Sequence, residues 1–172
     1  MPGSGFKSSC NDHHDRPGRV NALELKVPPP LVALLLAAGM WLAAATLPAL
    51  AIAFPWRHGL AVGIAGIGVG FALTGVYAFH RAGTTVNPMQ PAATSSMVTS
   101  GVYRVSRNPI YVGLLLALAG WAVFLSHALP FLFLPAFVLY MNRFQIAPEE
   151  RVLLAKFGDE YEAYERAVRR WL

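Results

Sequence analysis

Four apolar stretches constrain the fold of this chain more than any other feature of its sequence. They cover about residues 31–54, 59–79, 109–125 and 129–145. An α-helix rises about 1.5 Å per residue, so roughly 20 apolar residues are needed to cross the hydrocarbon core of a bilayer. The first two stretches reach that length. The last two are shorter, so we expect them to form a tightly paired hairpin. The pattern predicts an all-α integral membrane protein with about four transmembrane helices.

Composition supports the membrane assignment. Hydrophobic residues make up 55% of the chain and charged residues only 13%, about half the charged fraction of a soluble protein. The net charge is +5, and the basic residues gather beside the apolar stretches. That placement is typical of contacts with membrane lipid rather than with nucleic acid. The single cysteine, Cys10, cannot form an internal disulfide, and no His, Cys and acidic residues have the spacing of a metal site.

Basic residues outside the apolar stretches set the predicted orientation. They occur in the polar leader 1–27, in the loop 81–107 and from Arg143 onward, whereas the turn at 55–58 contains only Arg57. By the positive-inside tendency, both termini and the loop lie on the cytoplasmic side, which we take to be that of a bacterial inner membrane. We expect a disordered leader, followed by one multi-pass domain over the remaining residues, 28–172.

The second apolar stretch is rich in glycine, and some of its glycines lie four residues apart. Gly59 pairs in this way with Gly63, and Gly66 with Gly70. Small residues at this spacing let the backbone of another helix approach closely. We therefore expect these pairs to contribute to helix packing.

The polar stretch SGVYRVSRNPIY, residues 100–111, leads directly into the third apolar stretch. Asn108-Pro109 is typical of a helix start, because Asn caps free amides and Pro tolerates the first helical position. A helix N-terminus next to Arg104 and Arg107 favours a negatively charged group. The alternative is a simple helix cap with arginines that extend to the membrane surface, and the sequence leaves both interpretations open.

Two adjacent acids, Glu149 and Glu150, follow the last apolar stretch. Carboxylates beside hydrophobic segments are costly unless they meet a cation. Alternatively, they only occupy the first turn of the next helix, where acids complement the helix dipole.

Residues 148–172 are predicted to form a cytoplasmic amphipathic helical segment, interrupted at Gly158-Asp159. Its apolar residues recur at spacings of three and four: Leu154, Phe157, Tyr161, Tyr164, Val168 and Trp171.

The loop 81–107 and the segment 148–172 are predicted to share one face of the membrane, so these two features can form one pocket. Helix amides and arginines can hold a carboxylate while a glutamate holds an ammonium. An amino-acid-like ligand carries both groups. S-adenosylmethionine is such a ligand, and its adenine can stack on Tyr103 or Tyr111.

The segment GVYRVSRNPIYVG, followed by EERVLLAKFGDEYEAY, resembles a superfamily of integral-membrane methyltransferases. These are the isoprenylcysteine carboxyl methyltransferases and phospholipid methyltransferases. The resemblance covers about residue 81 to the end of the sequence. It follows the family order of G-x-Y, R-H-P-x-Y, a hydrophobic hairpin, E-E-x-x-L and F-G-x-E-Y-x-x-Y. It implies a site that encloses S-adenosylmethionine on the cytoplasmic side, and a substrate that arrives laterally from the bilayer.

The resemblance also implies residue roles. Glu149 is expected to hold the ammonium of the cofactor, with Glu150 in support. Further cofactor contacts fall by position on Ser95, Ser96, Met97, Val98, Tyr103, Asn108, Pro109, Ile110 and Tyr111. The candidates for orienting an anionic acceptor or the cofactor carboxylate, and thus the candidate catalytic residues, are Arg104, Arg107 and Arg143.

Two positions depart from the family pattern. Asn108 stands where the pattern has His, so it can hydrogen-bond the cofactor but cannot titrate near neutral pH. Gln145 stands where the prenylcysteine enzymes have an Arg associated with the substrate carboxylate, with Arg143 nearby. This substitution disfavours a prenylcysteine carboxylate as the acceptor. His80, beside Arg81, is a candidate base, although a histidine at an interface is more often only solvated.

Together these features predict a membrane-embedded methyltransferase that uses S-adenosylmethionine and releases S-adenosylhomocysteine. The acceptor is expected to be a lipidic or small hydrophobic molecule with a carboxylate, amine or thiol. The alternative is a non-enzymatic membrane protein, either a small transporter or an assembly factor. A transporter would be expected to carry polar residues inside its spans, and here the polar residues gather at one face. The sequence leaves the oligomeric state open.

Overall fold

The computed structural model describes residues 24–52, 55–83 and 96–172 of the chain. Over these residues the structure is helical. Its longer elements are α1 (Pro29–Thr46), α2 (Arg57–Arg81), α3 (Pro109–Leu125), α4 (Phe133–Met141), a π-helical turn η5 (Asn142–Ile146), α5 (Ala147–Phe157) and α6 (Asp159–Ala167). Within the described residues, three short 3₁₀ helices connect them: η1 (Pro48–Leu50), η3 (Gly101–Arg104) and η4 (Leu129–Leu132).

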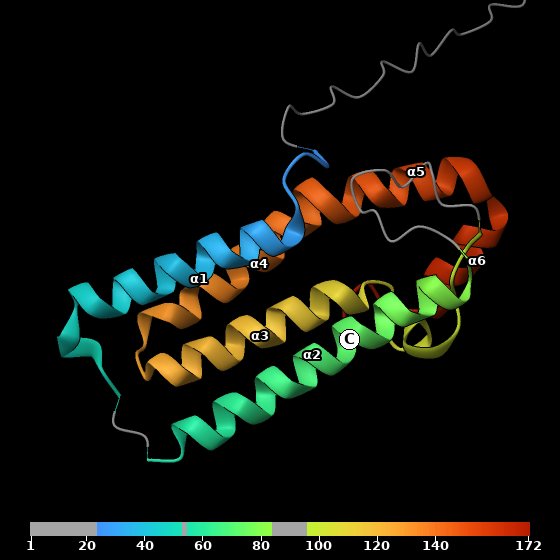
Figure 1. Ribbon diagram of the computed structural model, residues 1–172. Helices are drawn as coiled ribbons and strands as arrows, with labels where there is room; N and C mark the ends of the chain where they lie inside the picture. The colour runs from blue at the N-terminus through green and yellow to red at the C-terminus, as the bar shows by residue number, and fades with distance from the viewer. Residues whose placement is uncertain (1–23, 53–54, 84–95) are drawn as a thin grey trace, which may run out of the picture.

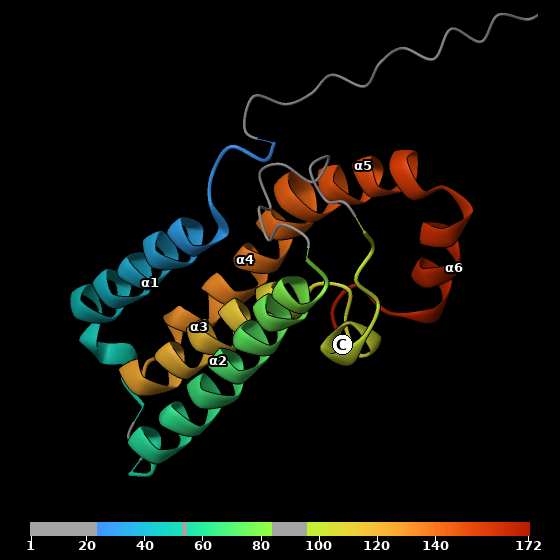
Figure 2. The same ribbon diagram turned by 45° about the vertical axis from the view of Figure 1, so that its right-hand side comes forward.

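The helices α1 to α4 run up and down beside one another (Figure 1). Helix α2 packs along α3, and α1 contacts both α3 and α4. Helices α5 and α6 extend beyond one end of this bundle, and η3 lies at the same end (Figure 2). We call this end, where residues 24–28, 81–83, 96–108 and 147–172 gather, the site end.

In the part of the chain that the structure describes, length and composition allow three helical stretches to cross a membrane: Pro29–Thr46, Arg57–Arg81 and Leu129–Phe157. The apolar part of the last stretch ends at Ile146, because α5 carries several charged residues, and we place its membrane-spanning part before α5. Helix α3, Pro109–Leu125, is a shorter apolar helix. The predicted all-α membrane fold is therefore confirmed.

The first helix is shorter than the sequence suggests. Helix α1 ends at Thr46 rather than near residue 54. A proline at position 48 lacks a backbone N–H and disfavours the helical conformation at the residue before it, and Leu47 has φ −128° and ψ 64°. The chain then pairs with the turn between α3 and η4, where the Ile52 N–H donates to the Ser126 carbonyl at 2.7 Å. The side chain of His127 also connects the end of α1 to the segment after α3 through two ring contacts. The ring Nε2 lies 2.7 Å from the Leu47 carbonyl oxygen, and the Leu129 N–H donates to the ring Nδ1 at 3.2 Å.

The closest helix contact lies between α2 and α3, at glycines other than those that the spacing indicated. A Cβ atom at Gly68 would lie 2.7 Å from the Gly113 carbonyl oxygen, and one at Gly113 would lie 2.5 Å from that of Gly68. The predicted packing glycines face open space instead: Gly59, Gly63, Gly66 and Gly70. That prediction is wrong, because spacing identifies a stripe of small residues but does not show which side of the helix meets a neighbour.

The apolar core lies between α1, α3 and α4. Its fully buried side chains include Met40, Phe137, Met141 and Ile146. The indole N–H of Trp121 in α3 donates to the Ala37 carbonyl of α1 at 3.0 Å, which satisfies its polar atom within the core. This packing fixes α3 and α4 relative to each other, and so fixes the two helix ends that carry the site.

Candidate active site

The 3₁₀ helix η3 positions Tyr103 at the site end. Its first residue, Gly101, has φ +64°, a conformation that favours glycine. Tyr103 is buried, and its ring meets that of Phe79 in α2 edge to face, with centroids 5.4 Å apart. The Tyr164 hydroxyl of α6 donates to the Tyr103 carbonyl at 2.7 Å. Tyr103 is thus held between α2 and α6.

Asn108 has a different role from the one expected. Helix α3 begins at Pro109, but the Asn108 side chain forms no hydrogen bond that caps it. Its Nδ2 donates instead to the Arg170 carbonyl at 3.0 Å, and its backbone N–H donates to the Ser106 hydroxyl at 3.1 Å. The predicted helix start is confirmed, because Asn108 occupies the N-cap position and Pro109 the first helical position; the expected side-chain capping bond is the part that is wrong, and the side-chain amide is oriented by the Arg170 carbonyl instead.

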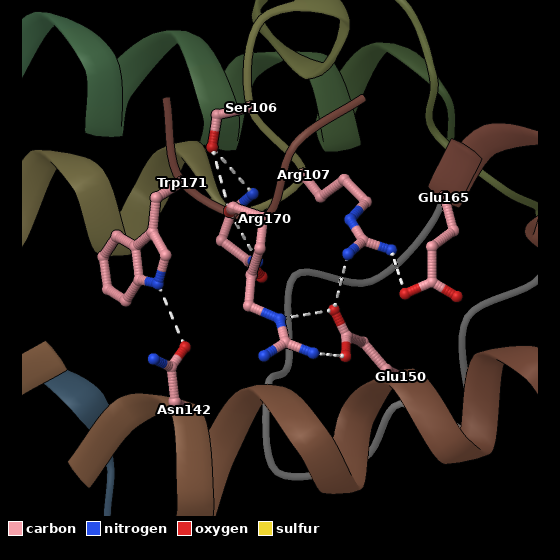
Figure 3. Close-up of polar contacts among 8 residues, drawn as sticks. Ser106, Arg107, Asn142, Glu150, Glu165, Arg170 and Trp171 are labelled. Carbon is pink, nitrogen blue, oxygen red and sulfur yellow. Dashed lines mark hydrogen bonds and ion pairs between the residues drawn. The ribbon is translucent and has the colours of Figure 1, made fainter. Parts of the chain in front are cut away.

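Arg107 and Glu150, both predicted site residues, contact each other (Figure 3). Arg107 Nη2 lies 3.2 Å from Glu150 Oε1, and Arg107 Nη1 lies 2.7 Å from Glu165 Oε1. Glu150 also accepts two hydrogen bonds from Arg170, at 3.0 and 2.5 Å. Burial acts to lower the pKa of Arg107, but the contact with Glu165 and the charge of Glu150 outweigh it, so the pKa is raised. The two carboxylates and two guanidiniums of this network balance in charge.

Glu149 lies beside that network without a cationic partner among the described residues. Its Oε2 accepts a hydrogen bond from the Tyr111 hydroxyl of α3 at 3.2 Å. Burial raises the pKa of Glu149 to about 7; the Tyr111 hydrogen bond opposes this shift and the charge of Glu150 adds to it. A buried carboxylate that must take up a proton or a cation near neutral pH is typical of a functional site.

Glu149 accepts a hydrogen bond from one tyrosine, and its charge acts on two others at the site end. Burial and then the charge of Glu149 raise the pKa of Tyr103. Burial and then the charge of Glu150, with a smaller effect of Glu149, raise the pKa of Tyr161, which is buried in α6. Tyr111 donates the hydrogen bond described above. Aromatic rings around a carboxylate form a setting that can accept a cationic group.

The other predicted arginines lie apart from Glu149. Arg143 Nη1 contacts Glu24 Oε1 at 3.1 Å, and Arg151 Nη2 contacts Glu24 Oε2 at 2.6 Å. Arg104, in η3, has an exposed side chain. Arg143 therefore joins η5 to the segment before α1, while Arg104 remains accessible at the site end.

Gln145 is fully buried in the π-helical turn. Its Nε2 donates to the Val27 carbonyl at 2.6 Å, so the amide orientation is determined by the partner. Its Oε1 is buried and has no hydrogen-bond partner among the described residues. Such turns often occur at functional sites.

The remaining predicted positions that the structure describes fall at the same end. Ser95 lies outside the described residues. Ser96 and Met97 are half-buried and Val98 is buried, while Ser96 Oγ is shielded from solvent without a partner in the described chain. Pro109 is buried and Ile110 half-buried, and both pack against α2 at Gly75. His80 is exposed at the end of α2. The structure thus gathers the described candidates at one end but separates Arg143 from the Tyr111–Glu149 pair.

Several residues of this site were not singled out as functional from the sequence. Tyr161, Tyr164 and Trp171 gave only an amphipathic pattern, which is equally typical of a surface helix. Ser106, Asn142 and Arg170 gave no local signal, because each has partners more than 20 residues away or on another element. Within the described residues no group of three or more His, Cys, Asp or Glu side chains could hold a metal ion.

Comparison of the sequence with known proteins identifies its family. The family model described as phospholipid methyltransferase matches residues 56–160, more than half of the chain. An uncharacterized protein from Haemophilus influenzae is 49% identical over 63 residues, which are 37% of this chain and 100% of that protein. No solved structure matches the chain. The chain therefore belongs to the phospholipid methyltransferase family, within the isoprenylcysteine carboxyl methyltransferase-like superfamily of membrane methyltransferases.

Proposed function

We propose that this membrane protein transfers a methyl group from S-adenosylmethionine to a lipidic or small hydrophobic acceptor, and that S-adenosylhomocysteine is the product. The observation that carries the proposal is the desolvated carboxylate of Glu149: the residue as a whole is half-buried, its carboxylate is hydrogen-bonded to Tyr111, and it forms no ion pair with a Lys, Arg or His of the described chain. The site is proposed to face the cytoplasm, because basic residues concentrate at this end of the bundle.

Charge complementarity supports the cofactor. A buried carboxylate is stable when a cation meets it, and the ammonium group of S-adenosylmethionine is such a cation. Arg107 and Arg170 are already balanced by Glu150 and Glu165. In this proposal Glu149 therefore binds the ammonium, and Glu150 supports the site indirectly by holding the two arginines.

Unpartnered polar atoms support a ligand at the same end. Ser96 Oγ and Gln145 Oε1 are both buried without a partner in the described chain. Buried polar atoms are normally hydrogen-bonded, and a bound ligand or water supplies the partner that the chain lacks. We assign Ser96 to the cofactor site, together with its neighbours Met97 and Val98 and with Ser95. Asn108, Pro109 and Ile110 form the adjoining wall at the start of α3.

The anionic groups in the reaction need a different partner. Arg143 is engaged by Glu24, and Arg107 by two carboxylates, so both now have structural partners. Arg104, whose side chain is exposed, lies in the polar segment 100–108 that precedes α3, which we call the junction. We propose that Arg104 faces the cofactor carboxylate or an anionic acceptor, while Arg107 maintains the junction.

Catalysis in this arrangement is mainly positioning. S-adenosylmethionine, when bound, would supply an activated methyl group on its sulfonium, and S-adenosylhomocysteine would be the leaving group as the acceptor atom forms the new bond. Glu149 and Tyr111 fix the donor end, and the rings of Tyr103 and Tyr161 provide apolar walls that exclude water. The apolar spans next to the site suit an acceptor that enters from the bilayer, whether it carries an amine, a thiol or a carboxylate.

The test is calorimetric titration of the detergent-purified protein with S-adenosylmethionine and S-adenosylhomocysteine. Wild type should bind both, and Glu149→Ala should lose binding. The matched control is Glu160→Gln, which removes the same charge from an exposed position in α6. If wild type binds neither compound, the proposal is wrong and a non-enzymatic membrane protein becomes the better interpretation. A labelled-methyl assay with total membrane lipid then identifies the acceptor class.

A further inference from the structure

The segment Val168–Leu172 leaves α6 in an extended conformation and lies along the residues that precede α3. Val168 has φ −128° and ψ 134°. The Arg107 N–H donates to the Arg169 carbonyl at 2.9 Å. The next carbonyl, that of Arg170, accepts from Asn108 Nδ2 at 3.0 Å and from the Ser106 hydroxyl at 3.3 Å (Figure 3). Two successive carbonyls of this segment thus anchor it to the junction.

The Arg170 side chain continues from this anchor to α5. Its guanidinium donates two hydrogen bonds to Glu150, from Nε at 3.0 Å and from Nη2 at 2.5 Å. Two parallel charge-assisted bonds fix the carboxylate in direction as well as in distance. Glu150 is the neighbour of Glu149 in the first turn of α5. Any rotation of that turn that moved Glu149 away from Tyr111 would also pull Glu150 from Arg170.

Trp171 connects the same segment to the π-helical turn. Its indole Nε1 donates to Asn142 Oδ1 at 3.0 Å (Figure 3). Its ring packs against the apolar core. The turn η5 lies directly before α5, so its geometry sets the direction in which α5 starts. A side chain that holds Asn142 therefore also limits how α5 can rotate about its axis.

We propose that Arg170 and Trp171 are positioning residues of the cofactor site, which hold Glu149 against Tyr111 through Glu150 and Asn142. The inference rests on the proposed function, because it assigns these residues to the same site. Neither side chain has to touch the cofactor. Arg170 fixes the first turn of α5 from the junction side, and Trp171 fixes the preceding turn from the core.

The test measures the affinity of the full-length protein for S-adenosylhomocysteine by calorimetry. Arg170→Ala should weaken binding by about tenfold or more, because a charge-assisted pair is lost and Glu150 is left with one partner. Arg170→Lys keeps the charge without the two parallel bonds and should recover part of the loss. Trp171→Phe, which keeps the ring but removes the N–H donor, should weaken binding severalfold. Arg166→Ala is the control, because Arg166 is exposed in α6 and pairs only with Glu162 within the described chain.

A double-mutant cycle separates positioning from general destabilisation. If Arg170 acts by holding Glu149 against Tyr111, then Arg170→Ala should have little further effect on affinity in a Tyr111→Phe background, which is expected to weaken binding without abolishing it. A residue that only stabilises the fold would weaken binding equally in both backgrounds. The inference is overturned if wild type binds and Arg170→Ala and Trp171→Phe bind as tightly, or if the two losses simply add. Failure of wild type to bind would overturn the proposed function itself, and the inference with it.

Discussion

The hydroxyl of Tyr111 donates a 3.2 Å hydrogen bond to Glu149, and this contact joins the first turn of α3 to the first turn of α5. The two residues are 38 positions apart, and the hairpin of α3 and α4 brings them together at the site end. The bond stabilises the ionised carboxylate of Glu149 but does not neutralise its charge. A cationic ligand would complete the pair.

The first prediction concerns this bond. Tyr111→Phe removes a donor from a buried carboxylate and should raise the pKa of Glu149 further, because the bond lowers it in the wild type. Loss of one bond to a charged group costs about 1.5–3 kcal/mol. We expect weaker binding of S-adenosylhomocysteine at pH 7, measured by calorimetry. An unchanged affinity would show that Tyr111 does not support the ionised form.

The second prediction is a pH dependence of cofactor binding. With a pKa of about 7, Glu149 must lose a proton before it can hold an ammonium. About a tenth of it is ionised at pH 6 and about three quarters at pH 7.5, so affinity should rise by up to about eightfold over this range. Glu160→Gln should keep this dependence, whereas Glu149→Gln should bind too weakly at every pH to show it. The folding stability of the ligand-free protein should change in the opposite direction. Because the carboxyl pKa of Glu149 is raised in the folded state, its contribution to stability falls as pH rises from about 4.5 to 7.

The third prediction concerns the contact between α2 and α3. Gly113→Ala places a Cβ against the Gly68 carbonyl and the Ala72 backbone and should destabilise the protein by about 1–3 kcal/mol. Thermal unfolding in detergent measures the effect. Gly63→Ala is the matched control, since it faces open space, and it should leave the melting temperature unchanged or slightly raised. Equal effects of the two substitutions would contradict the helix packing.

The fourth prediction separates stability from function at the far end of the bundle. His127→Ala removes both ring contacts, with the Leu47 carbonyl and the Leu129 N–H, and should lower stability by about 1–3 kcal/mol. His58→Ala is the control, because His58 is exposed at the same end. Cofactor affinity should change in neither variant. A loss of binding in His127→Ala at temperatures where it remains folded would contradict the separation.

The helical architecture was predictable because apolar stretches of membrane length admit few other structures. The sequence also predicted that residues 100–111 and Glu149 lie at the same end of the bundle, since polar groups beside apolar segments need partners. The details at Asn108, Gly68 and Arg170 were not predicted. The sequence shows that Asn108 starts α3, but the carbonyl that accepts from its Nδ2 belongs to Arg170, and only the path of the chain after α6 places that carbonyl there.

The same reason explains the arginines. From the sequence, Arg107 and Arg143 were both expected near the site. The sequence could not show that Arg107 forms ion pairs with Glu150 and Glu165, or that Arg143 forms one with Glu24. Ion pairs between distant residues depend on how elements pack, and local sequence contains little of that information. Gly68 and Gly113 illustrate the point for helix packing, since neither stands in the spaced pairs that indicated an interface.

The central claim is that S-adenosylmethionine binds between the start of α3 and the start of α5. Direct ultraviolet cross-linking of labelled cofactor, followed by peptide mapping, tests this most directly. We expect label in peptides that contain Tyr103, Tyr111 or Glu149, and S-adenosylhomocysteine should compete with this labelling. The label should be lost in Glu149→Gln and retained in Glu160→Gln. Label that is not competed, or that maps to the α2 residues Gly59–Gly70 away from the site end, would contradict it.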